Sequence, residues 1–85
     1  MSTVVREVKG RDLGHIVRLN NGNHCYVDSN NTFDCGYETM VFACDESGRN
    51  IDWSDLYCEH YRSYADMKKR HEYIINHLEE VLQNE

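Results

Sequence analysis

The sequence lacks any long apolar run, and no secretory signal is visible in its first residues. No stretch approaches the roughly 18 apolar residues that a membrane-spanning helix requires, so we expect neither a transmembrane segment nor a membrane partner. Residues 1–7 contain no basic stretch followed by an apolar segment, so no secretory signal is expected. These absences predict a cytoplasmic protein whose cysteines remain reduced.

Zinc knuckles are missing as well. Structural zinc sites usually take ligands from tight pairs such as C-x-x-C, and the sequence contains no such pair. The only close cysteine–histidine pairs are His24-Cys25 and Cys58-x-His60. We therefore expect no metal and no cofactor. Zinc stays open as an alternative, because small domains often need a metal ion or a covalent cross-link for stability. The thiols expected to be reduced and mostly buried, packing as small apolar groups, are Cys25, Cys35, Cys44 and Cys58.

Catalytic motifs are absent too. The sequence has no glycine-rich phosphate loop, no nucleophile elbow and no H-E-x-x-H, since His71-Glu72 lacks the second histidine. A nucleophile made of Cys58 and His71 would need an orienting third group. His71 is instead expected to hydrogen-bond to a sheet and fix the register of its helix. The sequence thus predicts a protein that is not an enzyme and has no catalytic residues.

The composition does support a small folded core. The 85 residues include 11% aromatic side chains, which argues against a disordered chain, and this length allows one domain, residues 1–85. Asn20-Asn21-Gly22-Asn23 is the strongest turn signal, because Asn-Gly tolerates the positive φ angles of a tight hairpin. Residues 1–12 are expected to form either an edge strand or a loosely ordered tail. Strands and turns are predicted for residues 13–62, with strands at 15–19, 24–28, 37–44 and 56–61, a polar loop at 29–32, and a loop or helical turn at 52–55.

The last third of the chain changes to helical periodicity. Ser63 is a suitable N-cap, with Asp66 three residues later, and no glycine or proline follows Gly48 to interrupt a helix. We predict an α+β fold of two layers, an antiparallel sheet of about four strands with one long C-terminal helix, within residues 63–83, on one face. The predicted buried stripe is Met67, His71, Ile74, Leu78 and Val81, widened by Tyr64, Ile75 and Leu82.

Negative charge is concentrated in one segment. Residues 34–59 hold seven carboxylates and one base, Arg49, while the other residues carry equal numbers of both signs, so this segment supplies the whole net charge of −6. Such a balance argues against direct nucleic-acid binding. The segment Asp45-x-Ser47-x-Arg49 does not follow the ligand order of an EF-hand. It predicts either a solubilising turn or an electronegative surface for a basic partner.

Aromatic residues accompany these carboxylates, and tyrosine and tryptophan are favoured as interface anchors. If the helix covers the face of Leu56, Cys58 and His60, the opposite face of that strand is available to a partner or a second copy. The alternative is that the N-terminal hairpin covers it. The predicted partner-binding residues are Asp45, Glu46, Asp52, Trp53, Asp55, Tyr57, Glu59 and Tyr61.

One stretch of the chain resembles a known group of proteins. The run Tyr37-Glu38-Thr39-Met40-Val41-Phe42, followed by Asp52-Trp53, Leu56, Tyr61, Ala65 and His71-Glu72, is similar to small phage and prophage proteins of unknown function, which carry an ETMVF-type strand, a tryptophan loop and an A…GH helix. The resemblance covers roughly residues 37–75, and Arg70 stands at the usual glycine position. It implies a phage or mobile-element origin and a bacterial cytoplasm, and it supplies no catalytic residues.

These patterns together favour function by binding. We expect a small accessory protein that binds a host or phage protein with a basic surface. The most specific version of this hypothesis is an acidic inhibitor of a host nucleic-acid or defence enzyme, of the anti-CRISPR kind. The alternatives are a structural or homo-oligomeric accessory protein and a metal- or thiol-binding module. The sequence does not distinguish a monomer from a homodimer.

Overall fold

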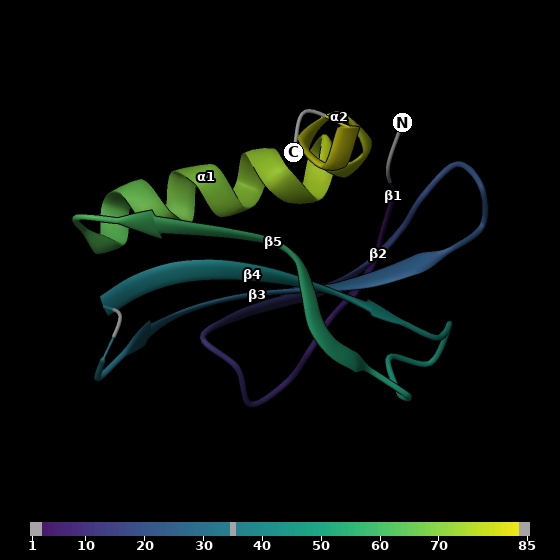
Figure 1. The fold of residues 1–85 in the computed structure, drawn as a ribbon, viewed down its shortest axis with the longest axis horizontal. Coiled ribbons are helices and arrows are strands. Elements are labelled where there is room, and N and C mark those ends of the chain that lie inside the picture. The colour runs from purple at the N-terminus through teal and green to yellow at the C-terminus, as the bar shows by residue number, and fades with distance from the viewer. Residues whose placement is uncertain (1–2, 35, 84–85) are drawn as a thin grey trace.

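The computed structural model describes residues 3–34 and 36–83. Five described strands form one antiparallel sheet in chain order, and two helices lie across one of its faces (Figure 1). This arrangement confirms the α+β class. No helix of the described residues is long and apolar enough to cross a membrane. The elements are β1 (Thr3–Glu7), β2 (Leu13–Arg18), β3 (His24–Thr32), β4 (Gly36–Cys44), β5 (Asp52–Tyr61), α1 (Tyr64–Asn76) and α2 (Leu78–Gln83).

The sheet is larger than the predicted four strands. Residues 3–7, expected as an edge strand or a tail, form β1 and pair with β2, for example Val4 with Val17. The expected polar loop at 29–32 is wrong, because β3 stays paired with β4 as far as Thr32. The loop or helical turn at 52–55 is also wrong, because β5 already begins at Asp52. The hairpin at Asn20–Asn23 is confirmed, with Gly22 at a φ of +90°.

The single long helix is in fact two helices. The Ser63 cap is confirmed, since the Ser63 hydroxyl accepts a hydrogen bond from the Asp66 backbone N–H at 3.1 Å. The break falls at His77, whose N–H bonds to the Ile74 carbonyl, and the Asn76 side chain donates to the Glu72 carbonyl at 2.8 Å. Asparagine commonly competes for backbone hydrogen bonds in this way, which weakens a helix at that point.

The helices bury their predicted stripe against the sheet. The five residues of that stripe are all buried, and Ile75 is buried beside them, whereas Tyr64 is exposed. Side chains alternate between the faces of each strand, so every second residue of β2, β3 and β4 meets the helices. This core joins the helices to the sheet through Val17, Cys25, Val27, Val41, Ile74, Ile75, Leu78 and Val81.

A second, smaller cluster lies on the opposite face of the sheet. Its buried members are Ile16, Tyr26 and Phe42, on three neighbouring strands. No helix of the described part of the chain covers it (Figure 1). The turn between β4 and β5 crosses it instead: the Arg6 guanidinium of β1 donates to the Ser47 carbonyl of that turn. We call this side of the sheet the open face.

Candidate functional site

The most exposed aromatic group of the open face is Trp53, at the start of β5. Its side chain is 68% exposed, although its ring meets Phe42 edge-on with the ring centroids 5.1 Å apart. Two shallow hollows of about 200 Å³ each flank it. One is lined by Asp28, Asn30, Thr32, Glu38, Met40, Phe42 and Trp53, and the other by Arg6, Val8, Ile16, Tyr26, Gly48, Ile51 and Trp53.

The turn beside Trp53 is shaped by one of the predicted acidic residues. The Asp45 carboxylate accepts hydrogen bonds from the Ser47 hydroxyl at 2.7 Å and from the Arg49 backbone N–H at 2.8 Å. It also accepts from the Asn50 amide at 2.8 Å. These donors lower the pKa of Asp45 to about 2, the Ser47 hydroxyl most strongly. Asp45 therefore holds its own turn, and its carboxylate is already occupied by local donors.

Three other predicted carboxylates are exposed in the β4–β5 turn and the first residues of β5, the stretch that also holds Trp53: Glu46, Asp52 and Asp55. Asp52 also accepts from the Ser54 backbone N–H at 3.0 Å. These three carboxylates and Trp53 thus all lie between Cys44, the end of β4, and Leu56 of β5.

The remaining three predicted residues lie elsewhere. The helices cover the face of β5 that carries Tyr57, Glu59 and Tyr61, the reverse of the arrangement that would have left that face available. Glu59 accepts from Arg70 of α1 at 2.9 Å and from the Tyr57 hydroxyl at 2.5 Å. The Tyr61 hydroxyl donates to Thr39 at 3.0 Å. These side chains therefore join β5 to the rest of the fold, and it is Cys58 and His60 that lie on the face away from the helices.

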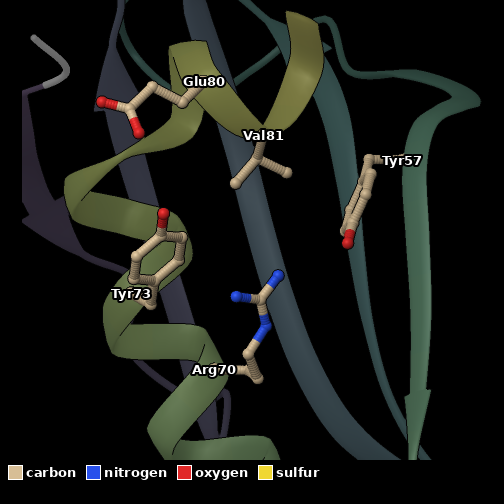
Figure 2. A pocket seen from close by; sticks show the side chains of 5 residues that line it. All are labelled: Tyr57, Arg70, Tyr73, Glu80 and Val81. Atoms are coloured by element: carbon tan, nitrogen blue, oxygen red, sulfur yellow. The ribbon is translucent and has the colours of Figure 1, made fainter. Parts of the chain in front are cut away.

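Figure 2 shows the hollow of about 190 Å³ that this packing leaves between α1, α2 and β5. Arg70 projects into it from α1, and its guanidinium lies 4.9 Å from the centre of the Tyr73 ring. The same guanidinium is paired with Glu59, and these hydrogen bonds raise the pKa of Arg70 and lower that of Glu59. Because the guanidinium of Arg70 is already paired with Glu59, we interpret this hollow as part of the packing between α1 and β5.

A chain of hydrogen bonds runs through the interior beneath α1. His71, 1% exposed, contacts the Ser29 hydroxyl at 2.6 Å and the His15 ring nitrogen at 2.8 Å. The Ser29 hydroxyl in turn contacts that of Thr39 at 2.5 Å. Burial, and then the neighbouring His15, lower the pKa of His71 to about 4. The expectation that His71 hydrogen-bonds to the sheet is confirmed. Ser29 and His71 are both buried, so this serine–histidine contact lies inside the fold.

The cysteines divide between two environments. Cys25, Cys44 and Cys58 are thiols, as expected, and Cys35 lies outside the described residues. Burial raises the pKa of the Cys25 thiol to about 11 and raises that of Cys44 as well. Cys58, however, is exposed on the open face, which corrects the expectation that the thiols are mostly buried.

Cys58 belongs to a cluster of potential metal ligands that the sequence alone did not bring together. The Glu38 carboxylate, the Cys58 sulfur and a ring nitrogen of His60 all lie within 4.8 Å of one another. Glu38 stands opposite His60 across the β4–β5 ladder, and Met40 stands opposite Cys58. The spacing Cys58-x-His60 was visible in the sequence, but the position of Glu38 beside it depends on strand register.

Comparison with known protein families, with curated protein sequences and with solved structures finds no match for this chain.

Proposed function

We propose that this protein acts by binding another protein through the open face of its sheet, with Trp53 at the centre of the contact. The observation that carries the proposal is the position of Trp53, which is 68% exposed above an apolar cluster that no described helix covers. Exposed large aromatic residues that rest on a packed base are the usual centres of protein interfaces.

The base beneath Trp53 supports this role. Ile16, Tyr26 and Phe42 are buried, so the surface under the indole is already packed before a partner arrives. The edge-on contact with Phe42 limits the positions of the ring. A side chain that is ordered in advance loses little conformational entropy on binding, which leaves more of its contact energy for affinity.

The charge around Trp53 supports a basic partner. Glu46, Asp52 and Asp55 expose carboxylates at this end of the sheet, and the chain carries a net charge of −6. Complementary charge steers association and selects partners. The proposed partner is a host or phage protein in a bacterial cytoplasm whose basic surface would otherwise contact nucleic-acid phosphates. The protein would then act as an inhibitor that occupies this surface.

The test is capture of a partner from bacterial lysate, followed by binding measurements with variants of the purified chain. Trp53→Ala should weaken binding by about 30-fold, which is the loss typical of a central interface residue. The variant Glu46→Gln/Asp52→Asn/Asp55→Asn should slow association and flatten its dependence on salt.

Matched controls remove the same groups from other parts of the surface. Tyr64→Ala deletes an exposed aromatic side chain at the start of α1, and Asp66→Asn/Glu72→Gln/Glu80→Gln deletes three exposed carboxylates on the helices, which cover the other face of the sheet. Both should bind as the wild type does. Equal binding by Trp53→Ala and the wild type would refute the proposal. A dimer that Trp53→Ala dissociates in size-exclusion chromatography would identify the partner as a second copy, and so would refute a basic partner.

A further inference from the structure

We infer that Glu38, Cys58 and His60 form a binding site for one zinc ion on the open face of the sheet. Three ligand atoms of different chemistry, a carboxylate oxygen, a thiol sulfur and an imidazole nitrogen, lie within 4.8 Å of one another. The inference does not use Trp53 as an observation, although Glu38 also lines one of the two hollows beside that residue.

The sheet itself creates the arrangement. Cys58 and His60 are two residues apart on β5, so their side chains leave the strand on the same face. Glu38 on β4 is the direct cross-strand neighbour of His60 and shares that face. With zinc–ligand bonds of about 2.0–2.3 Å, ligand atoms in a tetrahedral site stand roughly 3.3–3.8 Å apart. Small side-chain rotations therefore bring the three atoms to bonding positions without moving a strand.

The burial of Glu38 supplies a second, independent observation. Its side chain lies in a residue only 8% exposed, yet no cationic side chain of the described residues forms an ion pair with it. Its partner is neutral, the Thr32 hydroxyl at 3.3 Å. Buried carboxylates are ordinarily paired with a cation or bound to a metal, because removing a charge from water is costly. A zinc ion would provide the missing positive charge.

A residue beside Glu38 also has a buried polar atom without a hydrogen-bond partner among the described residues. Asn30 of β3 stands directly opposite Glu38 on the same face. Its side-chain oxygen is buried and has no hydrogen-bond partner among the described residues, while its amide nitrogen donates to Asp28 at 3.3 Å. An acceptor left unsatisfied beside a buried carboxylate marks a place where a hydrated cation would fit, since water bound to the ion is a hydrogen-bond donor.

The donor set selects the metal. Calcium and magnesium prefer oxygen ligands only, whereas a thiolate with an imidazole and a carboxylate suits zinc. The three protein ligands leave a fourth tetrahedral position, and no described helix covers this face. Zinc sites with three protein ligands and one exchangeable position are those that bind water or an external ligand. Here that position would face solvent or the bound partner.

The experiment uses the full chain, prepared metal-free under a phosphine reductant and titrated with Zn²⁺. We expect one zinc per chain. Co²⁺ in place of zinc should give a thiolate-to-metal charge-transfer absorption, which reports the Cys58–metal bond directly. Cys58→Ser and His60→Gln alter exposed side chains, so both variants should keep the fold by circular dichroism. Each should weaken zinc binding at least as much as loss of a supporting hydrogen bond does, about 10–100-fold.

The chain offers a matched control on the neighbouring β3–β4 ladder, at the opposite end of β4 from Glu38. His24 and Cys44 are direct cross-strand neighbours on β3 and β4 and lie outside the three-residue cluster. His24→Gln/Cys44→Ser should bind zinc with wild-type affinity and keep the cobalt absorption. Unchanged zinc affinity in Cys58→Ser or His60→Gln, or wild-type protein without the charge-transfer band, would overturn the inference. So would loss of binding in the His24/Cys44 control alone.

Discussion

Acidification from pH 7.5 to pH 5 should destabilise this protein through His71. The pKa of a histidine is 6.5 when unperturbed, but burial and the neighbouring His15 lower that of His71 to about 4. The folded state therefore takes up this proton at a lower pH than the unfolded state. The stability that depends on neutral His71 is fully present above pH 6.5 and is lost as the pH falls through 4.

The size of the effect follows from the two pKa values. As the pH falls from 7.5 to 5, the excess of protons bound by the unfolded state rises from nearly zero to almost one, and the loss of stability over this range adds up to about 2 kcal/mol. Near pH 4 and below the loss levels off at about 3 kcal/mol. The charged groups that act on His71 oppose each other: His15 of β2 disfavours the imidazolium, and Asp28 of β3 favours it. A domain with a total stability of about 5–10 kcal/mol would show this loss clearly.

The assay is urea unfolding at several pH values between 7.5 and 5, in chelator. His71→Gln keeps a polar group beside Ser29 and His15 but cannot titrate, so its stability should be lower at pH 7.5 and fall much less on acidification. His24→Gln removes a histidine from the far end of β3 and should retain the wild-type pH dependence. A His71→Gln variant with the full wild-type slope would refute the reasoning, because the proton would then bind elsewhere.

Three further changes test the packing. Ile74→Asp should unfold the domain, because it buries an unpaired charge in the core. As a control, Glu72→Asp on the exposed side of α1 should change the free energy of unfolding by less than about 0.5 kcal/mol. A near-normal melting temperature for Ile74→Asp would contradict the assignment of Ile74 to the core. Ser63→Ala should cost about 1 kcal/mol in urea unfolding by removing the α1 cap, and no loss would mean that the cap is not needed. Glu38→Gln in chelator should stabilise the chain by about 1 kcal/mol and abolish any rise in melting temperature caused by zinc. A destabilised variant would mean that the fold already compensates the charge of this carboxylate.

The accuracy of the sequence predictions depends on how local each signal is. The buried stripe of the helices and the Ser63 cap follow from spacing within a few residues, and both are confirmed. The break at His77 could not be predicted, because apolar spacing continues across it from Ile74 to Leu78. The extension of β3 to Thr32 was hidden by two asparagines, which are poor strand formers that pairing with β4 overrides.

The face of β5 that packs against the helices could not be predicted from the local sequence. Both faces of this strand alternate polar and apolar groups of similar size, so periodicity could not say which one meets the helix. The pairing of Glu59 with Arg70 and the place of Tyr57 beside the core decide it. The same choice brings Cys58 and His60 to the open face beside Glu38. This cluster of three potential ligands on two strands thus depends on the register of the strands and on the side that the helices cover. Neither can be predicted from the residue spacing within one strand.

The two faces of the sheet differ in how completely their buried polar groups are paired. Beneath the helices, His71, Ser29 and Thr39 satisfy one another, and Glu59 is paired with Arg70. On the open face, a buried carboxylate has no cationic partner among the described residues, and a buried amide oxygen beside it accepts no hydrogen bond. Interior groups that are fully satisfied stabilise a fold, whereas unsatisfied ones lower its stability unless something outside the chain binds them. Both proposed sites, the protein-binding surface at Trp53 and the zinc site at Glu38, therefore lie on the open face.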